Sequence, residues 1–458
     1  MSTGTVRALV AGSASLAYAL MCATIGWRVY ARRRAARQAL RAVAGEAAPL
    51  LVAHASQTGT GEEIARQTAA ALRTAGVPVT LLSFDALDTA TLRATSEALL
   101  VVSTYGEGDP PDSAAAFVAR LRRDEPDLGS LHFGLLALGD RSYAHFCGFG
   151  RELDAWLQQR GATALFPRID VDNGDAAALR EWRHCLSHVA GTADLPDWQG
   201  APFQTWTLRA RQHLNPGSLG APLYQLDIEP PAGVPAQWEA GDLLQIEPPT
   251  EPGGRPREYS IGSIPADGAV QLLVRIERRA DGSQGLVSSW LAVASTGASI
   301  SARLRAHANF RIDDNAQRDL VLIGNGTGLA GLRAHLRQRR SAREAGAPAR
   351  RHWLIFGERQ AVHDGWCTEE LAAWQRDGLL TQLDLVYSRD AQADHYVQDR
   401  LRREAGRLRE WVQSGAAIYV CGSLEGMAAG VDAALQEVLG AGTLAELRQQ
   451  RRYRRDVY

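Results

Sequence analysis

One short segment of the chain combines hydroxyl and glycine residues in a pattern that suits a phosphate group. This segment opens a helical pattern and consists of Ser56, Gln57, Thr58, Gly59, Thr60 and Gly61. Hydroxyls and glycine amides at the N-terminus of a helix form a site for an anion. The segment lacks the Gly-Lys-Ser/Thr ending of a nucleoside triphosphate loop, which favours a monophosphate. Taken alone, it could equally be an ordinary capped turn.

Two further segments place aromatic rings beside glycines. The first consists of Ser103, Thr104, Tyr105, Gly106 and Gly108, and the second of Leu138, Gly139, Asp140, Tyr143, Phe146 and Cys147. The glycines let the backbone approach a flat ligand, and the Tyr105 ring can stack on it. A phosphate site together with two aromatic loops predicts a pocket for flavin mononucleotide (FMN).

The elements around these segments predict where the segments meet. Short apolar runs alternate with amphipathic stretches, which is typical of a doubly wound parallel sheet. The expected strands are Leu50–Ala55, Val77–Ser83, Leu99–Ser103, Leu131–Gly139 and Ala164–Asp170. The expected helices lie near Glu62–Ala75, Ser113–Arg123, Gly148–Gln159 and Asp175–Ala190. Because such sheets bind ligands at the carboxyl ends of their strands, we expect all three segments at one sheet edge.

Beyond a linker rich in Gly, Pro, Asp and Trp, shorter alternating segments predict an antiparallel barrel. They are Gln204–Arg211, Leu223–Glu229, Leu243–Glu247, Arg257–Gly262 and Val270–Arg278. One of them contains Arg257, Glu258, Tyr259 and Ser260. Two positions apart on a strand, the Arg and the Tyr share a face, where they can bind a pyrophosphate and stack on an isoalloxazine ring. A second phosphate site is predicted at Gly285, Leu286, Val287 and Ser288.

Strands and helices alternate again from Asp319 onwards, which predicts a second parallel sheet. The apolar run Leu320–Gly324 leads into a glycine-rich turn before a helical pattern, and this turn contains Gly326, Thr327 and Gly328. A turn of this kind suits the pyrophosphate of a dinucleotide. A glycine fingerprint alone is weak evidence, and its position downstream of the barrel strengthens it.

These motifs, over residues 49–458, resemble those of the sulfite reductase flavoproteins and related diflavin reductases, in which a flavodoxin-like domain is joined to a ferredoxin–NADP reductase module. The resemblance implies FMN, FAD and NADPH as cofactors. It places the FMN ring between the regions of Tyr105 and Tyr143, and it assigns the adenosine 2′-phosphate to Ser388, Arg389, Tyr396 and Gln398. It also implies a hydride-transfer trio of Ser260, Cys421 and Asp456, with Cys421 beside the nicotinamide, and Tyr458 over the far face of the FAD ring.

The chain departs from this family at three places. Only Pro248–Pro256 separates two barrel segments, so the family's helical connecting insert is missing. Asp394 stands where the family has Lys, which weakens phosphate binding by electrostatics and leaves NADH as the alternative to NADPH. Gly331 stands where the family usually has Pro.

Composition excludes several functions. The net charge of −1 provides no basic field for nucleic acid. All 50 basic residues are Arg, which excludes Schiff-base and Lys–phosphate chemistry. The five cysteines show no metal-ligand spacing and read as free thiols in a reducing compartment. No metal site is predicted.

The N-terminal region predicts a membrane anchor. Ala8–Trp27 carries no charge, and a helix of about 20 residues spans about 30 Å, the thickness of a bilayer core. Arginines follow this stretch, so the positive-inside bias places the catalytic domains in the cytoplasm. A cleaved signal peptide and a buried helix are the alternatives.

The sequence therefore predicts a transmembrane anchor (1–30), a tether (31–48), a flavodoxin-like FMN domain (49–190), a linker (191–203), an FAD-binding barrel (204–316) and an NADP-binding α/β domain (317–458). The expected path of electrons runs from NADPH through FAD and FMN to a haem- or metal-containing reductase at the membrane. The alternatives are a sulfite reductase haemoprotein or a ferric chelate as acceptor, and a non-enzymatic flavin scaffold or sensor.

Overall fold

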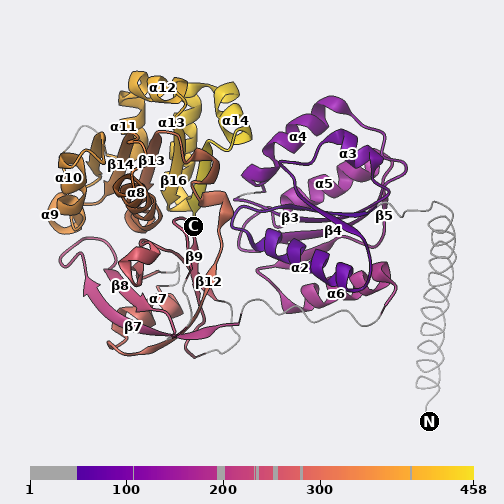
Figure 1. The fold of residues 1–458 in the computed structure, drawn as a ribbon, viewed down its shortest axis with the longest axis horizontal. Helices are drawn as coiled ribbons and strands as arrows, with labels where there is room; N and C mark the ends of the chain where they lie inside the picture. Colours follow the sequence, from indigo (N-terminus) through magenta and orange to yellow (C-terminus); the bar gives the residue numbers. More distant parts are fainter. Residues whose placement is uncertain are drawn as a thin grey trace, which may run out of the picture.

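A computed structural model of the chain describes residues 49–106, 108–192, 202–231, 233, 237–250, 256–278, 282–391 and 395–458. These residues form three sheets, each with its own helices (Figure 1). The predicted anchor and tether lie outside the described residues, as do Glu107, Asp394 and most of the predicted linker.

The first sheet is parallel and has the order β2-β1-β3-β4-β5, with β6 paired to β4. Its strands are β1 (Leu50–Ala55), β2 (Val79–Ser83), β3 (Glu97–Ser103), β4 (His132–Gly139), β5 (Thr163–Ala164) and β6 (Ile169–Asp172). Its helices are α2 (Thr60–Thr74), α3 (Thr89–Ala94), α4 (Asp112–Asp124), α5 (Gly148–Gln159) and α6 (Ala176–Ala190). The middle residues of β3 and β4 are buried throughout, because helices cover both faces of the sheet.

The last predicted strand of this domain, Ala164–Asp170, is divided into β5 and β6. Both pieces pair with β4, and Pro167 lies between them. Proline has no N–H to donate to a strand partner, so the ladder is interrupted there.

The second sheet is antiparallel, with the order β10-β9-β12-β7-β8-β11. Its elements are β7 (Gln204–His213), β8 (Leu223–Glu229), β9 (Leu243–Ile246), β10 (Arg257–Ser260), β11 (Val270–Arg275), α7 (Leu286–Val293) and β12 (Ser299–Arg305). A bridge between Ile261 and Leu272 joins its two end strands, which curls the sheet towards a barrel. β12 was not predicted from the sequence. β9 pairs directly with β10 across the shortened connection.

The third sheet is parallel, with the order β15-β14-β13-β16-β17. Its strands are β13 (Leu320–Asn325), β14 (His352–Glu358), β15 (Gln382–Tyr387), β16 (Ala417–Gly422) and β17 (Tyr453–Val457). Its helices are α8 (Leu329–Glu344), α9 (Ala361–Asp364), α10 (Thr368–Arg376), α11 (Val397–Arg403), α12 (Ala405–Gln413), α13 (Ala429–Leu439) and α14 (Ala441–Gln449). Separate apolar cores fill its two faces.

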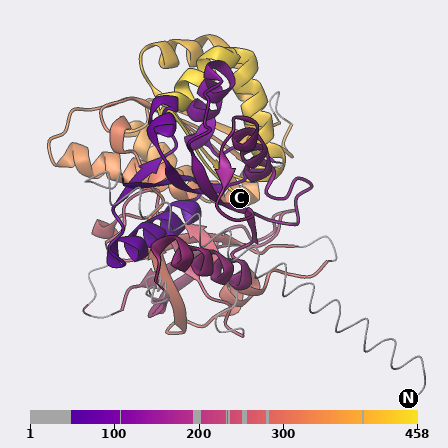
Figure 2. The ribbon, with the colours of Figure 1, turned by 90° about the vertical axis from the view of Figure 1, so that its right-hand side faces the viewer.

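The flavodoxin-like domain lies against both of the other domains. Helix α4 packs on α14, and the chain's C-terminus lies near the boundary between the domains (Figures 1 and 2). The described part of the chain therefore brings the ends of β1 and β3 close to the last strand, β17.

The membrane localisation expected from the sequence is corrected here. Among the helices of the described residues, none has both the length and the apolar character needed to cross a bilayer. The expectation depended on Ala8–Trp27, which lies outside the described residues and is only moderately apolar because it contains several small and hydroxyl-bearing residues.

Candidate functional site

The three predicted FMN segments meet at one edge of the first sheet, at the carboxyl ends of β1, β3 and β4. The Thr104 N–H donates to Leu138 O (2.8 Å), which joins the second segment to the third. In the first segment, Ser56 Oγ accepts from the amides of Gly59 (3.0 Å) and Gly61 (3.1 Å). The predicted convergence of the three segments is thus present in the structure.

The glycines of these segments are required by close approaches. Gly59 has φ +85°, and a Cβ on Gly61 would lie 3.2 Å from Ser103 Oγ. A Cβ on Gly139 would lie 2.8 Å from Cys147 N. Together these glycines leave a cradle free of side chains at the sheet edge, and such a cradle fits a phosphate and a flat ring.

The aromatic residues of the pocket differ in their positions. Tyr143 and Phe146 are half-buried at the third segment. Tyr105 is also half-buried, and its buried hydroxyl has no hydrogen-bond partner among the described residues. The Arg455 guanidinium lies 4.7 Å from the centre of the Tyr105 ring. Tyr105 therefore faces the domain boundary, where it contacts the C-terminal strand.

Cys147 is a packing residue in this arrangement. It is fully buried and donates to Ala137 O (3.4 Å), and burial raises the pKa of its thiol to about 12. It is the N-cap of α5, with φ +53°, and its predicted contact with FMN stays a prediction.

The predicted FAD residues lie on β10 and at the start of α7. Arg257 and Tyr259 are half-buried and share one face of β10, whereas Glu258 is exposed and points the other way. At α7, the Ser288 hydroxyl accepts from Glu277 N (3.2 Å) and donates to Gly285 O (3.2 Å). These contacts fix the turn from which α7 presents its first amides.

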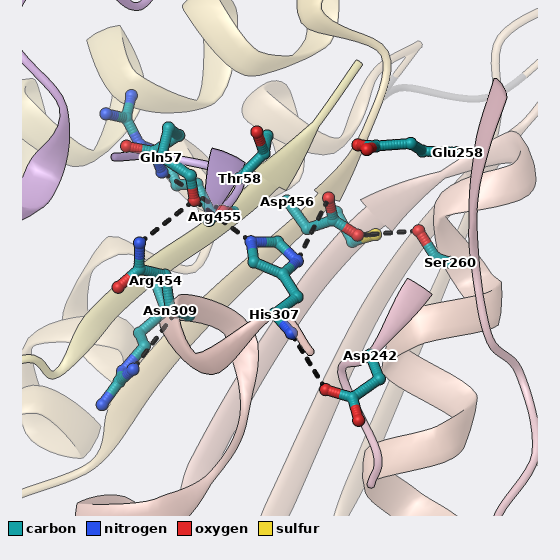
Figure 3. Close-up of polar contacts among 12 residues, drawn as sticks. Gln57, Thr58, Asp242, Glu258, Ser260, His307, Asn309, Arg454, Arg455 and Asp456 are labelled. Atoms are coloured by element: carbon teal, nitrogen blue, oxygen red, sulfur yellow. Dashed lines mark hydrogen bonds and ion pairs between the residues drawn. The ribbon is translucent and has the colours of Figure 1, made fainter. Parts of the chain in front are cut away.

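The predicted hydride-transfer trio is assembled from three strands of two domains. Ser260 Oγ on β10 donates to Asp456 Oδ2 (2.7 Å; Figure 3). Cys421 Sγ donates to the same oxygen (3.6 Å). Cys421 and Asp456 are register partners on β16 and β17. All three are buried. Burial, with the charge of Asp456, raises the pKa of Cys421 well above its usual range, so it is a neutral thiol rather than a nucleophile.

His307 is a functional candidate that the sequence analysis missed. It is fully buried, its Nδ1 lies 3.9 Å from Asp456 Oδ1, and its Nε2 is 3.1 Å from Gln57 O in the FMN loop (Figure 3). Burial lowers its pKa, which favours a neutral ring. Since a carbonyl only accepts, the single N–H of that ring belongs on Nε2. A lone His in an irregular segment offers no pattern that would have identified it.

The glycine-rich turn lies at the carboxyl end of β13, beside the trio. A Cβ on Gly328 would lie 2.0 Å from Cys421 O, so only glycine fits there. Tyr458 Oη donates to Thr327 Oγ1 (3.1 Å), which places the C-terminal ring over this turn. A Cβ on Gly331 would lie 2.9 Å from the ring of Phe310. Although Gly331 stands where the related family usually has Pro, α8 still begins at Leu329.

Replacing Gly328 with Ala should destabilise the third domain by about 2 kcal/mol or more, because the methyl group would overlap backbone that cannot move without disturbing β16. Urea denaturation followed by circular dichroism measures this. Gly406→Ala is the matched control, since Gly406 lies in α12 with no atom within 4 Å of its added Cβ. Equal stability of G328A and wild type would contradict the crowding argument.

The four residues assigned to the 2′-phosphate surround the end of β15 and the start of α11. Ser388 and Arg389 follow β15, with their amides bonded to Glu358 O and Arg359 O. Tyr396 is exposed, and the Gln398 side chain packs against Gly430 on α13. β15 is the edge strand of the third sheet, two strands from β13, which carries the glycine-rich turn. The role of these four residues in binding the 2′-phosphate stays a prediction.

Comparisons with known proteins agree with this division of the chain. The flavodoxin family model matches residues 52–183, and the oxidoreductase NAD-binding domain model matches residues 322–433. The chain therefore contains a flavodoxin-like domain and a domain similar to the NAD-binding domains of oxidoreductases. It is an NADPH-dependent flavoprotein oxidoreductase with FMN, FAD and NADPH as its cofactors.

Its relatives include proteins described as sulfite reductase [NADPH] flavoprotein alpha-component. The one from Neisseria meningitidis serogroup B (strain MC58) is 28% identical and covers 91% of this chain and 90% of the relative. The relative from Salmonella typhi is 28% identical, and the alignment covers 94% of this chain and 93% of the relative. The relative from Bacillus subtilis strain 168 is 26% identical, and the alignment covers 89% of each chain. The first alignment extends over 556 residues, more than the 458 of this chain, so relatives carry segments that this chain lacks.

Proposed function

We propose that the chain is the electron-donating flavoprotein component of a sulfite reductase. In this proposal it takes electrons from NADPH and delivers them to a haem-containing partner that reduces sulfite. The observation that carries the proposal is the docking of the FMN loop on the hydride-transfer residues. Gln57 contacts Arg455 O (3.3 Å) and His307 (3.1 Å), and both neighbour Asp456. Two redox sites placed in contact favour a relay over separate binding functions.

The chain's own residues have distinct tasks in this relay. FAD would be held by Arg257, Tyr259 and the start of α7, and FMN by the three segments at the edge of the first sheet. When bound, the flavins accept hydride and pass on single electrons. Asp456 fixes the direction of the Ser260 hydroxyl and holds the Cys421 thiol, while burial of all three excludes water from the transfer site.

The choice of acceptor is supported by the three relatives named above, each of which is described as a sulfite reductase component. Their similarity extends over both flavin modules rather than over one shared domain. A ferric chelate is the competing acceptor, and a flavin scaffold without turnover is the competing class of function.

The test mixes the flavin-loaded protein anaerobically with NADPH in a stopped-flow spectrometer. We expect FAD bleaching first and FMN bleaching second, at one equivalent each of FAD and FMN. Adding a sulfite reductase haemoprotein together with sulfite should reoxidise the flavins. A protein that contains one flavin type, or whose flavins stay oxidised, would refute the relay. Reoxidation by ferric citrate but not by haemoprotein and sulfite would refute the proposed acceptor.

A further inference from the structure

Three residues of the second domain contact the phosphate loop of the first domain in order. Arg305 is the last residue of β12, and His307 and Asn309 follow it at every second position. Arg305 donates to Thr58 O, His307 to Gln57 O, and Asn309 to Ser56 O. Two segments that run in opposite directions thus lie side by side, and each of these three contacts is made to a loop carbonyl.

Arg305 goes further into the loop than the other two. Its Nη2 also donates to Thr60 Oγ1 (2.7 Å), so the guanidinium lies across Gly59. A Cβ on Gly59 would lie 3.4 Å from Ala306 O and 3.6 Å from Arg305 Nη2. With 12% of its side chain exposed, Arg305 is a nearly buried cation at the centre of the predicted phosphate site, and its Nη1 forms an ion pair with Glu258 on β10.

The predicted phosphate loop has no positively charged side chain of its own. Residues Ser56 to Gly61 contain none, and the first turn of α2 carries Glu62 and Glu63. Arg66 pairs with both carboxylates. Burial lowers the pKa of Arg305 to about 10, and Glu63, Asp456 and Glu62 oppose that shift, so Arg305 stays charged at neutral pH. Guanidinium groups bind phosphate oxygens with two parallel hydrogen bonds.

We propose that Arg305 is a ligand of the FMN phosphate, supplied by the second domain across the interface. The proposal rests on the proposed function, since it requires FMN in the first domain. FMN is then bound most tightly when the two domains are docked, and by thermodynamic reciprocity FMN strengthens the docking. Besides Ser56, Thr58 and Thr60, the phosphate site therefore includes a residue from outside the flavodoxin-like domain.

The test compares two ligands that differ only by the phosphate. Full-length protein saturated with FAD and depleted of FMN is titrated with FMN and with riboflavin, and binding is followed by quenching of flavin fluorescence. Arg305→Gln should weaken FMN binding by about 10- to 100-fold while changing riboflavin binding less than about 2-fold. The variant lacks the charged donor, and of the two ligands only FMN has a phosphate that can accept from it. Arg305→Lys keeps the positive charge but not the two parallel donors of the guanidinium, so it should weaken FMN binding less than Arg305→Gln does.

Two control variants separate this role from a structural one. Arg451→Gln removes the third domain's partner of Asp85, an interface contact away from the loop. Arg303→Gln, two residues before Arg305 on β12, removes a contact to Gln245 on β9. Neither should change the ratio of FMN to riboflavin affinity. If R305Q weakens both ligands equally or neither, or if R451Q reproduces its FMN loss, the proposal is wrong. Absence of FMN binding by wild type would instead refute the proposed function.

Discussion

Replacing Asp456 with Asn should slow the reduction of FAD by NADPH about 100-fold, a size typical of losing one preorganised charged group at a reaction centre. Asp456 Oδ2 is the common acceptor for Ser260 Oγ (2.7 Å) and Cys421 Sγ (3.6 Å). An amide can accept both bonds through its single oxygen, but it accepts them more weakly than a carboxylate does. The charge that keeps both side chains pointing inwards is also lost.

The rate is measured at the FAD absorbance in the stopped-flow experiment, with NADPH in excess. FAD content and the midpoint of thermal unfolding are recorded for each variant, so that slow reduction can be separated from poor folding. The matched control is Asp364→Asn, the same change at another buried carboxylate of the third domain, which is bonded to Asn215 and Ser218. Equal rates in D456N and wild type would mean that the trio does not position the reaction.

The strands that are buried on both faces were the easiest elements to predict from the sequence. β3, β4, β13 and β14 are buried on both faces and appear in the sequence as continuous apolar runs. β12 alternates Ser and Arg with apolar residues and so resembles a polar segment. β17 is less predictable still, because its sequence, Tyr-Arg-Arg-Asp-Val, is charged although all five residues are buried.

The charges of β17 are buried because their partners come from distant parts of the chain. Arg454 donates to Ala308 O and Asn309 O, and Arg455 pairs with Asp112, more than 300 residues earlier in the chain. No local pattern indicates such contacts. For the same reason the predicted segments for FMN and hydride transfer were found through their motifs, whereas His307 and Arg305, which join them, were not.

The pair formed by Asp112 and Arg455 leads to the last prediction, that Asp112→Asn should slow FMN reduction about 10-fold and leave FAD reduction unchanged. Arg455 donates to both carboxylate oxygens of Asp112 (2.5 and 3.1 Å) and also pairs with Asp432 (2.8 Å). Only 7% of its side chain is exposed. The substitution removes the charge of Asp112 that the buried Arg455 pairs with when the flavodoxin-like domain is docked on the third domain. The docked state is therefore destabilised, and the fraction of molecules in that state falls.

The electrostatics of Asp112 agree with this expectation. Burial by itself would raise the pKa of its carboxyl, yet the charge and hydrogen bonds of Arg455 hold that pKa below its usual value. The ionised form is therefore stabilised in the docked arrangement, and a neutral amide loses that stabilisation. Because Asp112 lies on α4, outside the strands that carry the hydride-transfer trio, FAD reduction provides an internal reference within the same experiment.

Asp85→Asn is the matched control, since Asp85 also pairs across the interface but with Arg451, whose side chain is 48% exposed. Exposed ion pairs contribute about 1 kcal/mol or less, so D85N should slow FMN reduction far less than D112N. If the two variants slow it equally, any lost interface charge matters and the buried pair has no special role. If D112N reduces FMN at the wild-type rate, docking through this pair does not limit electron transfer between the flavins.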